Sequence, residues 1–381
     1  MHPPPTLSAA VRDRLRAPAS QAWTLPPLAY TDPSVWAWER DALFGAEWIA
    51  VGRTAQLAAP GDQLAVDVVG QPILVTHGAD GELRAMSNVC LHRSMPLVAD
   101  TGSSRRIVCP YHRWSYDLDG TLHTAPMMAD DFPGPDGGVD CRLPQFAVEV
   151  WEGFVFVSMS PAPAPLAPQL AALSDRLANY RLADLVVVDT IEYDSPWNWK
   201  LLVENFMEAY HHIGPHRDTF QQNHPAATAF VADNQGAPFA LLEMPGTDSV
   251  DVSDGLPFLA GLEREQRSDM LAFCVFPSTL VATTGTLVTW YQLEPSAHDR
   301  MRLRIHVLLE PDVAADPVVI AALPDLAAGI RWIHEEDIPV NEGPWRGLHA
   351  PTAAQGRLAP GELALWQFNQ YWLAHVDAGA P

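Results

Sequence analysis

The chain has 381 residues, of which 48% are hydrophobic, and a formal net charge of -23 at pH 7. Its 23 Lys and Arg against 46 Asp and Glu exclude a nucleic-acid partner, because phosphate binding needs clustered basic residues. No apolar run is long enough to cross a bilayer, and the N-terminus lacks a basic-then-apolar signal pattern, so we expect a cytoplasmic protein with no membrane span. Four cysteines are too few for a disulfide framework in a chain of this length, so reduced thiols are expected.

The N-terminal segment, residues 1–45, is expected to hold an arm and one helix. Residues 1–30 are rich in Pro and Ala with little periodicity, which is typical of an arm that lies over the surface. Asp32 followed by Pro33 then marks a helix start, because proline fits the first helical position and aspartate caps it.

A small antiparallel β domain is expected at residues 46–160. Short apolar segments broken by turns follow one another there. The pair Asp119-Gly120 predicts a two-residue hairpin turn. The expected strands are Trp48 to Val51, Leu64 to Val69, Ile73 to Thr76, Leu83 to Val89, Trp114 to Leu118, Phe146 to Val150 and Phe154 to Val157.

A proline-rich connection at residues 160–168 marks the clearest boundary, with a linker and helix expected at 161–184 and a second domain at 185–381. The polar region from Asn223 to Ser268 is expected to be a long loop or lid over a pocket. The order of the elements indicates an α+β domain in which a curved antiparallel sheet wraps helices. Strands are expected at 185–193, 271–276, 286–293 and 301–309, and helices from Asn198, at 317–338 and at 361–376.

The stretch from Asn198 to His216 gathers one carboxylate and three imidazoles at the end of an amphipathic helix. Glu208 and His211, three residues apart, are expected to share a face, and the helix is expected to stop at Gly214. His216 can then return beside His211, while His212 points elsewhere. Two imidazoles and a distant carboxylate would make the facial triad of non-haem Fe(II). The alternative is a polar helix end that happens to be rich in histidine.

The β domain carries the most specific pattern. Cys90-Leu-His92 and Cys109-Pro-Tyr-His112 each present one thiolate and one imidazole on a loop. Zinc usually takes both Cys from one element and both His from another. A Rieske [2Fe-2S] cluster needs two Cys on one iron and two His on the other, which these paired loops supply directly, so we favour the cluster over zinc. Cys141 and Cys274 have no His at a ligand spacing and are expected in the core.

These motifs together resemble the terminal oxygenase (alpha) subunits of Rieske non-haem iron ring-hydroxylating oxygenases. The resemblance implies an N-terminal antiparallel β Rieske domain followed by a helix-grip (START-like) catalytic domain, with a Rieske cluster and a mononuclear Fe(II) as cofactors. It extends over nearly the whole chain. The matching stretches are Trp36 to Gly52, Asn88-Val-Cys-Leu-His-Arg93, Cys109-Pro-Tyr-His-Arg-Trp-Ser-Tyr-Asp117, Asn198 to His216 and Glu335-Glu-Asp-Ile-Pro-Val-Asn-Glu-Gly343.

The resemblance implies His211, His216 and Asp337 as iron ligands, and Asn205 and Glu208 as catalytic residues. Without it, Asp337 would be interpreted as part of a solvated acidic helix end, which Pro339 is expected to loosen. The family also implies a head-to-tail homotrimer. In such a trimer Glu208 bridges His112 of one subunit and His211 of its neighbour.

Ring dioxygenases carry Asp at the position of Glu208. Glu at this position resembles the carnitine, choline, betaine and stachydrine oxygenases. Monooxygenation of a small organic substrate, by hydroxylation or oxidative demethylation, is therefore preferred. The alternatives are cis-dihydroxylation of an arene and, from another class, a Rieske electron-transfer protein. The expected partners are O2, a separate reductase, and in some systems a ferredoxin. Arg113 stands where many relatives have a glycine. The aromatic residues that could line a pocket for a cationic substrate are Phe206, Phe276, Trp290 and Tyr291.

Overall fold

The computed structural model describes residues 2–128, 141–247 and 255–379. It divides into two compact units, one formed by Phe44–Leu166 and the other by Met1–Leu43 together with Ala167–Pro381. None of the helices in the described ranges combines the length and the apolar character that a membrane span requires.

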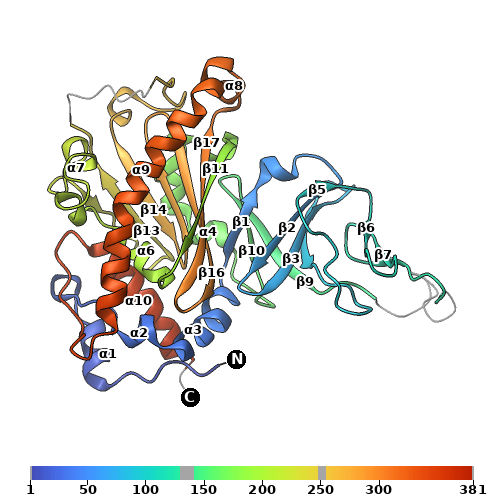
Figure 1. The fold of residues 1–381 in the computed structure, drawn as a ribbon, viewed down its shortest axis with the longest axis horizontal. Helices are drawn as coiled ribbons and strands as arrows, with labels where there is room; N and C mark the ends of the chain where they lie inside the picture. The colour runs from blue at the N-terminus through green and yellow to red at the C-terminus, as the bar shows by residue number, and fades with distance from the viewer. Residues whose placement is uncertain (1, 129–140, 248–254, 380–381) are drawn as a thin grey trace. The chain divides into compact units, whose positions relative to one another are not determined.

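The unit from Phe44 to Leu166 is built on an antiparallel sheet with the strand order β1-β10-β9-β4-β3-β2-β5 (Figure 1). All seven expected strands are present, and the additional strands β5 and β6 have only two residues each, too short for an apolar pattern to reveal. A second, three-stranded sheet has the order β6-β7-β8. The strands of this unit are β1 Ile49–Arg53, β2 Asp62–Val68, β3 Gln71–His77, β4 Leu83–Ser87, β5 Gly102–Ser103, β6 Ile107–Val108, β7 Ser115–Tyr116, β8 Leu122–Thr124, β9 Gln145–Trp151 and β10 Phe154–Ser158.

The hairpin between β7 and β8 exists, but its loop is longer than the two residues predicted. The backbone N–H of Asp117 donates to the carbonyl of Thr121 (2.9 Å), and that of Gly120 donates to the carbonyl of Asp117 (2.8 Å). Gly120 has φ +87°, a left-handed conformation that glycine adopts without strain. Residues 118–120 therefore form a three-residue loop, in which glycine follows a tight turn rather than completing it.

The larger unit contains a second antiparallel sheet, with the strand order β11-β17-β16-β15-β14-β13-β12. Its long helix α9 lies across one face of this sheet, and α10 lies beside the N-terminal helices (Figure 1). The elements of this unit that concern the site are β11 Val186–Ser195, α6 Trp199–Phe206, β12 Phe230–Val231, β13 Phe239–Met244, β14 Met270–Val275, β15 Thr279–Thr283, β16 Val288–Ala297, β17 Arg300–Leu309, α9 Pro317–Leu348 and α10 Leu363–Ala378. The expected α+β class with a curved antiparallel sheet is confirmed.

Three strands of this sheet were not predicted, and one of them, β12, has only two residues. β13 lies inside the region from Asn223 to Ser268 that was expected to be a loop, and all six of its residues are buried. Its sequence Phe-Ala-Leu-Leu-Glu-Met has no polar alternation, because both of its faces are covered. β15 follows β14 after a three-residue connection, so the two strands form one continuous apolar stretch in the sequence.

Helix α9 runs for 32 residues, ten more than expected, and contains Pro324, Pro339 and Pro344. The expectation that the helix loosens beside Asp337 is wrong. Asn341 reaches back along the helix, and its Nδ2 donates to the carbonyl of Asp337 at 3.0 Å. This bond supports the turn in which Pro339 removes a backbone donor.

The N-terminal segment contains α1 Ala9–Leu15, α2 Leu28–Thr31 and α3 Pro33–Glu39, and the last of these begins at the expected Asp32 cap. Glu39 is fully buried at the end of α3. Its carboxylate accepts two hydrogen bonds from Lys200 Nζ (2.7 and 2.9 Å) and one each from the indole N–H of Trp199 (3.1 Å) and Trp372 (2.8 Å). One ion pair thus joins α3, α6 and α10.

Glu39→Gln should lower the free energy of unfolding by about 3 to 5 kcal/mol, because it leaves the buried Lys200 ammonium without its anion. Chemical denaturation of the two proteins measures the difference. Asp13→Asn, on an exposed position of α1, is the control and should change stability little. A Glu39→Gln protein as stable as the wild type would show that the pair is not structural.

Glu204, the one acid of α6, should make stability depend on pH. Burial raises the pKa of Glu204 to about 7, although the Tyr30 hydroxyl (2.5 Å) and Lys200 oppose the shift. A carboxyl whose pKa is raised by folding favours the folded state at low pH, and this contribution is lost as pH rises from the unfolded pKa towards 7. Glu204→Gln should therefore stabilise the protein at about pH 8 by about 1 to 2 kcal/mol and have little effect at about pH 5. Equal stability of the two proteins at both pH values would contradict this.

Candidate metal centres

The central helix ends earlier than expected. α6 begins at Trp199 after the cap Asn198, whose side chain accepts a hydrogen bond from the backbone N–H of Lys200 (3.1 Å), but it ends at Phe206 rather than near Gly214. Tyr210–Ile213 form a separate 3-10 turn. Glu208 lies in the break, and its carboxylate accepts the backbone N–H of His211 at 2.9 Å. Glu208 and His211 are therefore neighbours through a turn and not through a continuous helix face.

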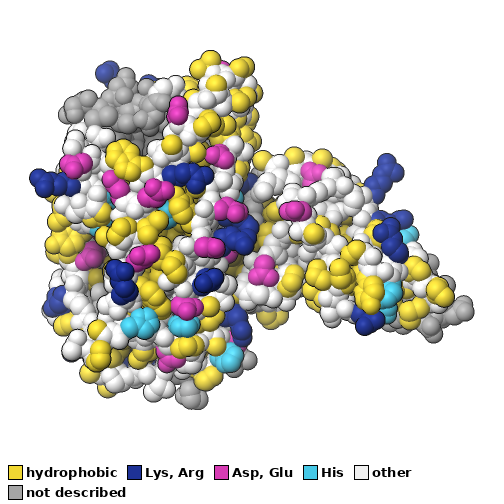
Figure 2. Space-filling model, viewed as in Figure 1, with side chains coloured by type: hydrophobic (Ala, Val, Ile, Leu, Met, Phe, Trp, Pro, Cys, Tyr) yellow, Lys and Arg dark blue, Asp and Glu magenta, His cyan; other side chains and the backbone are white. Residues whose placement is uncertain are grey.

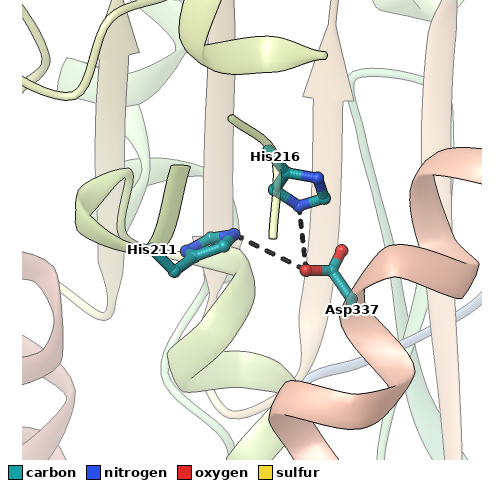
Figure 3. A group of neighbouring side chains, drawn as sticks. All are labelled: His211, His216 and Asp337. Atoms are coloured by element: carbon teal, nitrogen blue, oxygen red, sulfur yellow. Dashed lines mark hydrogen bonds and ion pairs between the residues drawn. The ribbon is translucent and has the colours of Figure 1, made fainter. Parts of the chain in front are cut away.

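His211, His216 and Asp337 meet in the larger unit, although 121 residues separate the last two (Figure 3). Their potential ligand atoms all lie within 4.8 Å of one another. Asp337 Oδ1 is 2.9 Å from His216 Nε2 and 3.6 Å from His211 Nε2. Two imidazoles come from the segment after α6 and the carboxylate from α9, so the group can hold a metal ion on one side.

Each of the two imidazoles is oriented by a second carboxylate. His211 Nδ1 lies 2.6 Å from Glu208 Oε1, and His216 Nδ1 lies 2.8 Å from Glu336 Oε2. Thr219 donates its hydroxyl to the same Glu336 oxygen at 2.8 Å. A carboxylate at Nδ1 holds a proton there, so Nε2 can offer its lone pair to a metal ion when it carries no proton of its own. Both Nε2 atoms face Asp337, which is the arrangement that a metal ion needs.

Asp337 is itself held by two amides. Asn205 Nδ2 donates to Asp337 Oδ1 (3.3 Å), and Asn341 Nδ2 donates to Asn205 Oδ1 (3.1 Å). Burial raises the pKa of Asp337, but the hydrogen bond and charge of His216 and the charge of His211 outweigh it and lower the pKa below its usual value. The carboxylate is therefore ionised at neutral pH.

His212 does not join the group. Its Nδ1 faces the carbonyl of His224 at 3.1 Å, and burial, with the neighbouring His211, lowers its pKa to about 3. Residue spacing predicted this direction. It did not predict Glu336 or Asn341, because a carboxylate and an amide on a polar helix face carry no sign of what they contact.

The four candidate cluster ligands lie in the smaller unit. Cys90 and Cys109 are buried in one apolar cluster, while His92 and His112 are exposed, with their ring centroids 4.7 Å apart. Trp114 stacks on His92 at 5.0 Å, and the Tyr116 hydroxyl lies 3.3 Å from Cys90 Sγ. The thiols therefore face the protein interior and the imidazoles face solvent.

The spacing of these four side chains bears on the choice between a cluster and a zinc ion. Ligands of one tetrahedral zinc all lie about 2.0 to 2.3 Å from the metal, and so lie close to one another. In the described part of the chain, no three of the four residues bring their ligand atoms within 4.8 Å of one another. The buried thiols and the exposed imidazoles thus form two separate pairs, and a Rieske cluster takes one pair of each kind.

The remaining cysteines are packed in the protein, and two of the four aromatic candidates line a cavity. Cys274 is buried, and Cys141 packs against the apolar cluster of the smaller unit, as expected. Phe206 and Tyr291 line a cavity of about 770 Å³ that also reaches His211 and Asp337. The other two candidates do not line it, because Trp290 stacks on His306 and Phe276 packs against Phe368.

The smaller unit carries the two Cys-His loops and the larger unit the His-His-Asp group, so the chain has two candidate metal centres. Residues 47–147 match the Rieske [2Fe-2S] domain, and residues 182–378 match the ring hydroxylating alpha subunit (catalytic domain). The chain belongs to this ring-hydroxylating alpha-subunit family. Membership carries a Rieske cluster and a mononuclear iron as its cofactors.

Several named proteins are similar to parts or all of the chain. The carnitine monooxygenase oxygenase subunit of Acinetobacter baumannii is 36% identical over 197 residues, which are 51% of this chain and 52% of that protein. The glycine betaine monooxygenase oxygenase subunit of Chromohalobacter salexigens is 39% identical over 196 residues, 51% and 43% of the two chains. The aligned part of the chain thus spans about half the length of the curated relatives it matches.

Solved structures share the fold over nearly the whole chain. The quaternary ammonium Rieske monooxygenase CntA in complex with L-carnitine has a TM-score of 0.76 at 24% identity and covers 93% of this chain and 96% of its own. Naphthalene 1,2-dioxygenase from Rhodococcus sp. has a TM-score of 0.80 at 21% identity and covers 99% and 100%. At these identities the likeness concerns the fold.

Proposed function

We propose that this chain is the oxygenase component of a monooxygenase that hydroxylates or oxidatively demethylates an organic substrate. The observation that carries the proposal is the position of the His211, His216 and Asp337 group, which opens on one side into the cavity. In this proposal those three residues hold the mononuclear iron, and Cys90, Cys109, His92 and His112 hold the cluster. Relatives named for carnitine and glycine betaine monooxygenation support one oxygen atom rather than two.

The bound iron supplies oxygen activation, and the cluster supplies single electrons to it. The protein supplies the geometry. Glu208 and Glu336 keep the protons of His211 and His216 on Nδ1, and Asn205 with Asn341 fixes the direction of the Asp337 carboxylate. Phe206 and Tyr291, with ring centroids 4.9 Å apart, position substrate on the open side of the group.

Electrons come from a separate reductase, in some systems through a ferredoxin, in this proposal. All four cysteines are free thiols, which fits a reducing cytoplasm. An electron carrier alone would use the Cys-His loops and would give no purpose to the His-His-Asp group. The test is turnover with a reconstituted reductase and isotopically labelled oxygen gas against quaternary amines, arenes and terpenoid acids. Products with one labelled oxygen are expected, whereas two hydroxyls with loss of aromaticity would identify a dioxygenase.

We further propose a homotrimer in which Glu208 bridges two subunits. Tyr210 and Ile213, on the turn beside Glu208, are 54% and 56% exposed, and the cluster loops expose Leu91 and Tyr111 by 41% and 52%. Large apolar side chains at both centres favour contact between copies of the chain. Glu208, already bonded to His211 Nδ1, would then reach the neighbour's His112 and connect the two metal centres.

Glu208→Gln distinguishes this bridge from a metal ligand. If Glu208 bridges two imidazoles, the variant should retain both metal centres, because their ligands are intact, but electron transfer between subunits should fail. With the cluster reduced beforehand, mixing with oxygen and substrate should give at least tenfold slower cluster reoxidation and little product. Glu208→Asp tests reach and should also be impaired. Loss of mononuclear iron in Glu208→Gln, or reoxidation at the normal rate, would refute the bridging role.

A further inference from the structure

The cavity follows helix α9 far beyond the His-His-Asp group. Its wall on α9 includes Val319, Ala322, Leu326, Ile330, Ile333 and Asp337, which recur every three or four residues and so share one face of the helix. At 1.5 Å per residue, this wall extends for about 27 Å. The candidate metal group lies at the Asp337 end, and the Val319 end lies five turns away.

The opposite wall of the cavity is formed by the sheet and is mostly apolar. It includes Leu242 and Met244 of β13, Ala272 of β14, Ala282 of β15 and Leu287. Leu287 and Val319 belong to one buried cluster with Leu309, which makes the far end of the cavity apolar. Burial of an alkyl group against such walls contributes about 0.8 kcal/mol for each methylene.

The lining of the cavity also contains charged and aromatic side chains. Outside the His-His-Asp group and Glu208, the lining also contains the charged side chains of Asp218, Arg267, Asp269 and Asp325 and polar ones such as Thr284 and Thr289. Phe206 and Tyr291 contact each other at the metal end. A compact trimethylammonium compound can use those two rings but leaves the long apolar part of the cavity empty.

We propose that the substrate is an elongated, mainly aliphatic molecule whose reacting end lies at His211, His216 and Asp337 and whose apolar body lies along α9. This inference rests on the proposed monooxygenase function and names its substrate class. A volume of about 770 Å³ is in the upper part of the range of small-molecule pockets, which run from about 300 to 1,000 Å³. The chain thus takes a longer substrate than the betaines for which its relatives are named.

Binding as a function of chain length tests the proposal. The holoenzyme with an oxidised cluster is titrated without oxygen, by calorimetry, with n-alkyl trimethylammonium ions and with n-alkanoic acids of increasing length, and with carnitine and glycine betaine. In at least one series Kd should fall about fourfold for each methylene buried, which corresponds to about 0.8 kcal/mol. Carnitine and glycine betaine should bind more weakly than the longest compounds of that series. A Kd independent of length in both series would overturn the proposal.

Two neighbouring alanines of α9 supply a matched pair of variants. Ala322 lines the cavity about 22 Å along the helix from Asp337, whereas Ala321 does not line it. Both are exposed, so a phenylalanine at either should be tolerated by the fold. Ala322→Phe should raise the Kd of long compounds at least tenfold more than that of short ones, and Ala321→Phe should raise neither. Equal effects of Ala322→Phe on long and short compounds would contradict the proposed position of the aliphatic body.

Turnover of the same compounds separates this inference from the proposed function. If carnitine or glycine betaine gains one labelled oxygen and binding shows no dependence on length, the monooxygenase function stands and the substrate class is wrong. If long compounds bind with the expected dependence but no compound gains oxygen, the cavity assignment stands and the function is wrong.

Discussion

Cys109→Ser should remove the visible absorption of the cluster and its EPR signal in the reduced state, and should abolish turnover. Cys109 is 1% exposed within the apolar cluster of the smaller unit, so no water replaces its sulfur easily. A serine hydroxyl is a harder and much less acidic ligand than a thiol, and it does not hold iron in the same way. We expect turnover below the detection limit, because the second centre then has no source of electrons.

Cys141→Ser is the matched control for this experiment. Cys141 lies in the same unit and packs against the same apolar cluster, but it is not part of a Cys-His loop. Its substitution should leave the absorption and EPR spectra unchanged. A normal spectrum in Cys109→Ser, or loss of the spectrum in Cys141→Ser, would contradict the Rieske assignment.

His216→Ala should leave the cluster spectra unchanged, in contrast to Cys109→Ser, and should likewise abolish activity. His216 is 1% exposed, and its Nε2 lies 2.9 Å from Asp337 Oδ1, so alanine leaves the group with only two side chains. Loss of residues that merely orient a metal ligand weakens metal binding roughly 10- to 100-fold. Loss of the ligand itself should weaken mononuclear iron binding by at least about a hundredfold, while the cluster spectra remain normal.

His212→Ala is the control, because His212 neighbours the group but faces the carbonyl of His224. It should retain mononuclear iron. Retention of iron and activity in His216→Ala, together with their loss in His212→Ala, would exchange the roles of the two histidines. Binding of iron to protein that was depleted of metal measures both variants without requiring turnover.

The parts of the fold that sequence could predict are those encoded by short-range patterns. The seven expected strands of the smaller unit alternate with clear turn residues, and the two Cys-His loops specify a cluster by type and spacing alone. The ligands of the candidate mononuclear iron centre were harder to predict from the sequence. His211 and His216 are close in sequence, but Asp337 lies on another helix, and family resemblance identified it where spacing did not.

Other features depend on tertiary contacts that leave no local pattern. β13 is buried on both faces and lies in a region interrupted by Gly and Pro, so its apolar run could not be distinguished from a loop. α9 continues through three prolines because contacts such as the amide of Asn341 on the Asp337 carbonyl support it. The roles of Glu336 and Asn341 appear only when α9 is placed beside the segment after α6.

The surface charge bears on the kind of partner and not on the shape of the cavity. On the face of the molecule in Figure 2, acidic and basic side chains are interspersed with apolar ones, and no broad basic surface is visible there. This agrees with the exclusion of nucleic acid from the net charge of -23. Composition nevertheless gave no indication of the long apolar cavity along α9, since its residues are ordinary aliphatic ones spread over α6, α9 and several strands.

The central claim is that one chain holds a Rieske cluster and a separate mononuclear iron. The most direct test is to measure iron, zinc and acid-labile sulfide in protein purified without oxygen and supplied with iron. We expect about three irons and about two sulfides for each chain, with the iron falling to about two in His216→Ala. A content of two irons in the wild type, unchanged in His216→Ala, or a stoichiometric zinc content without sulfide, would contradict it.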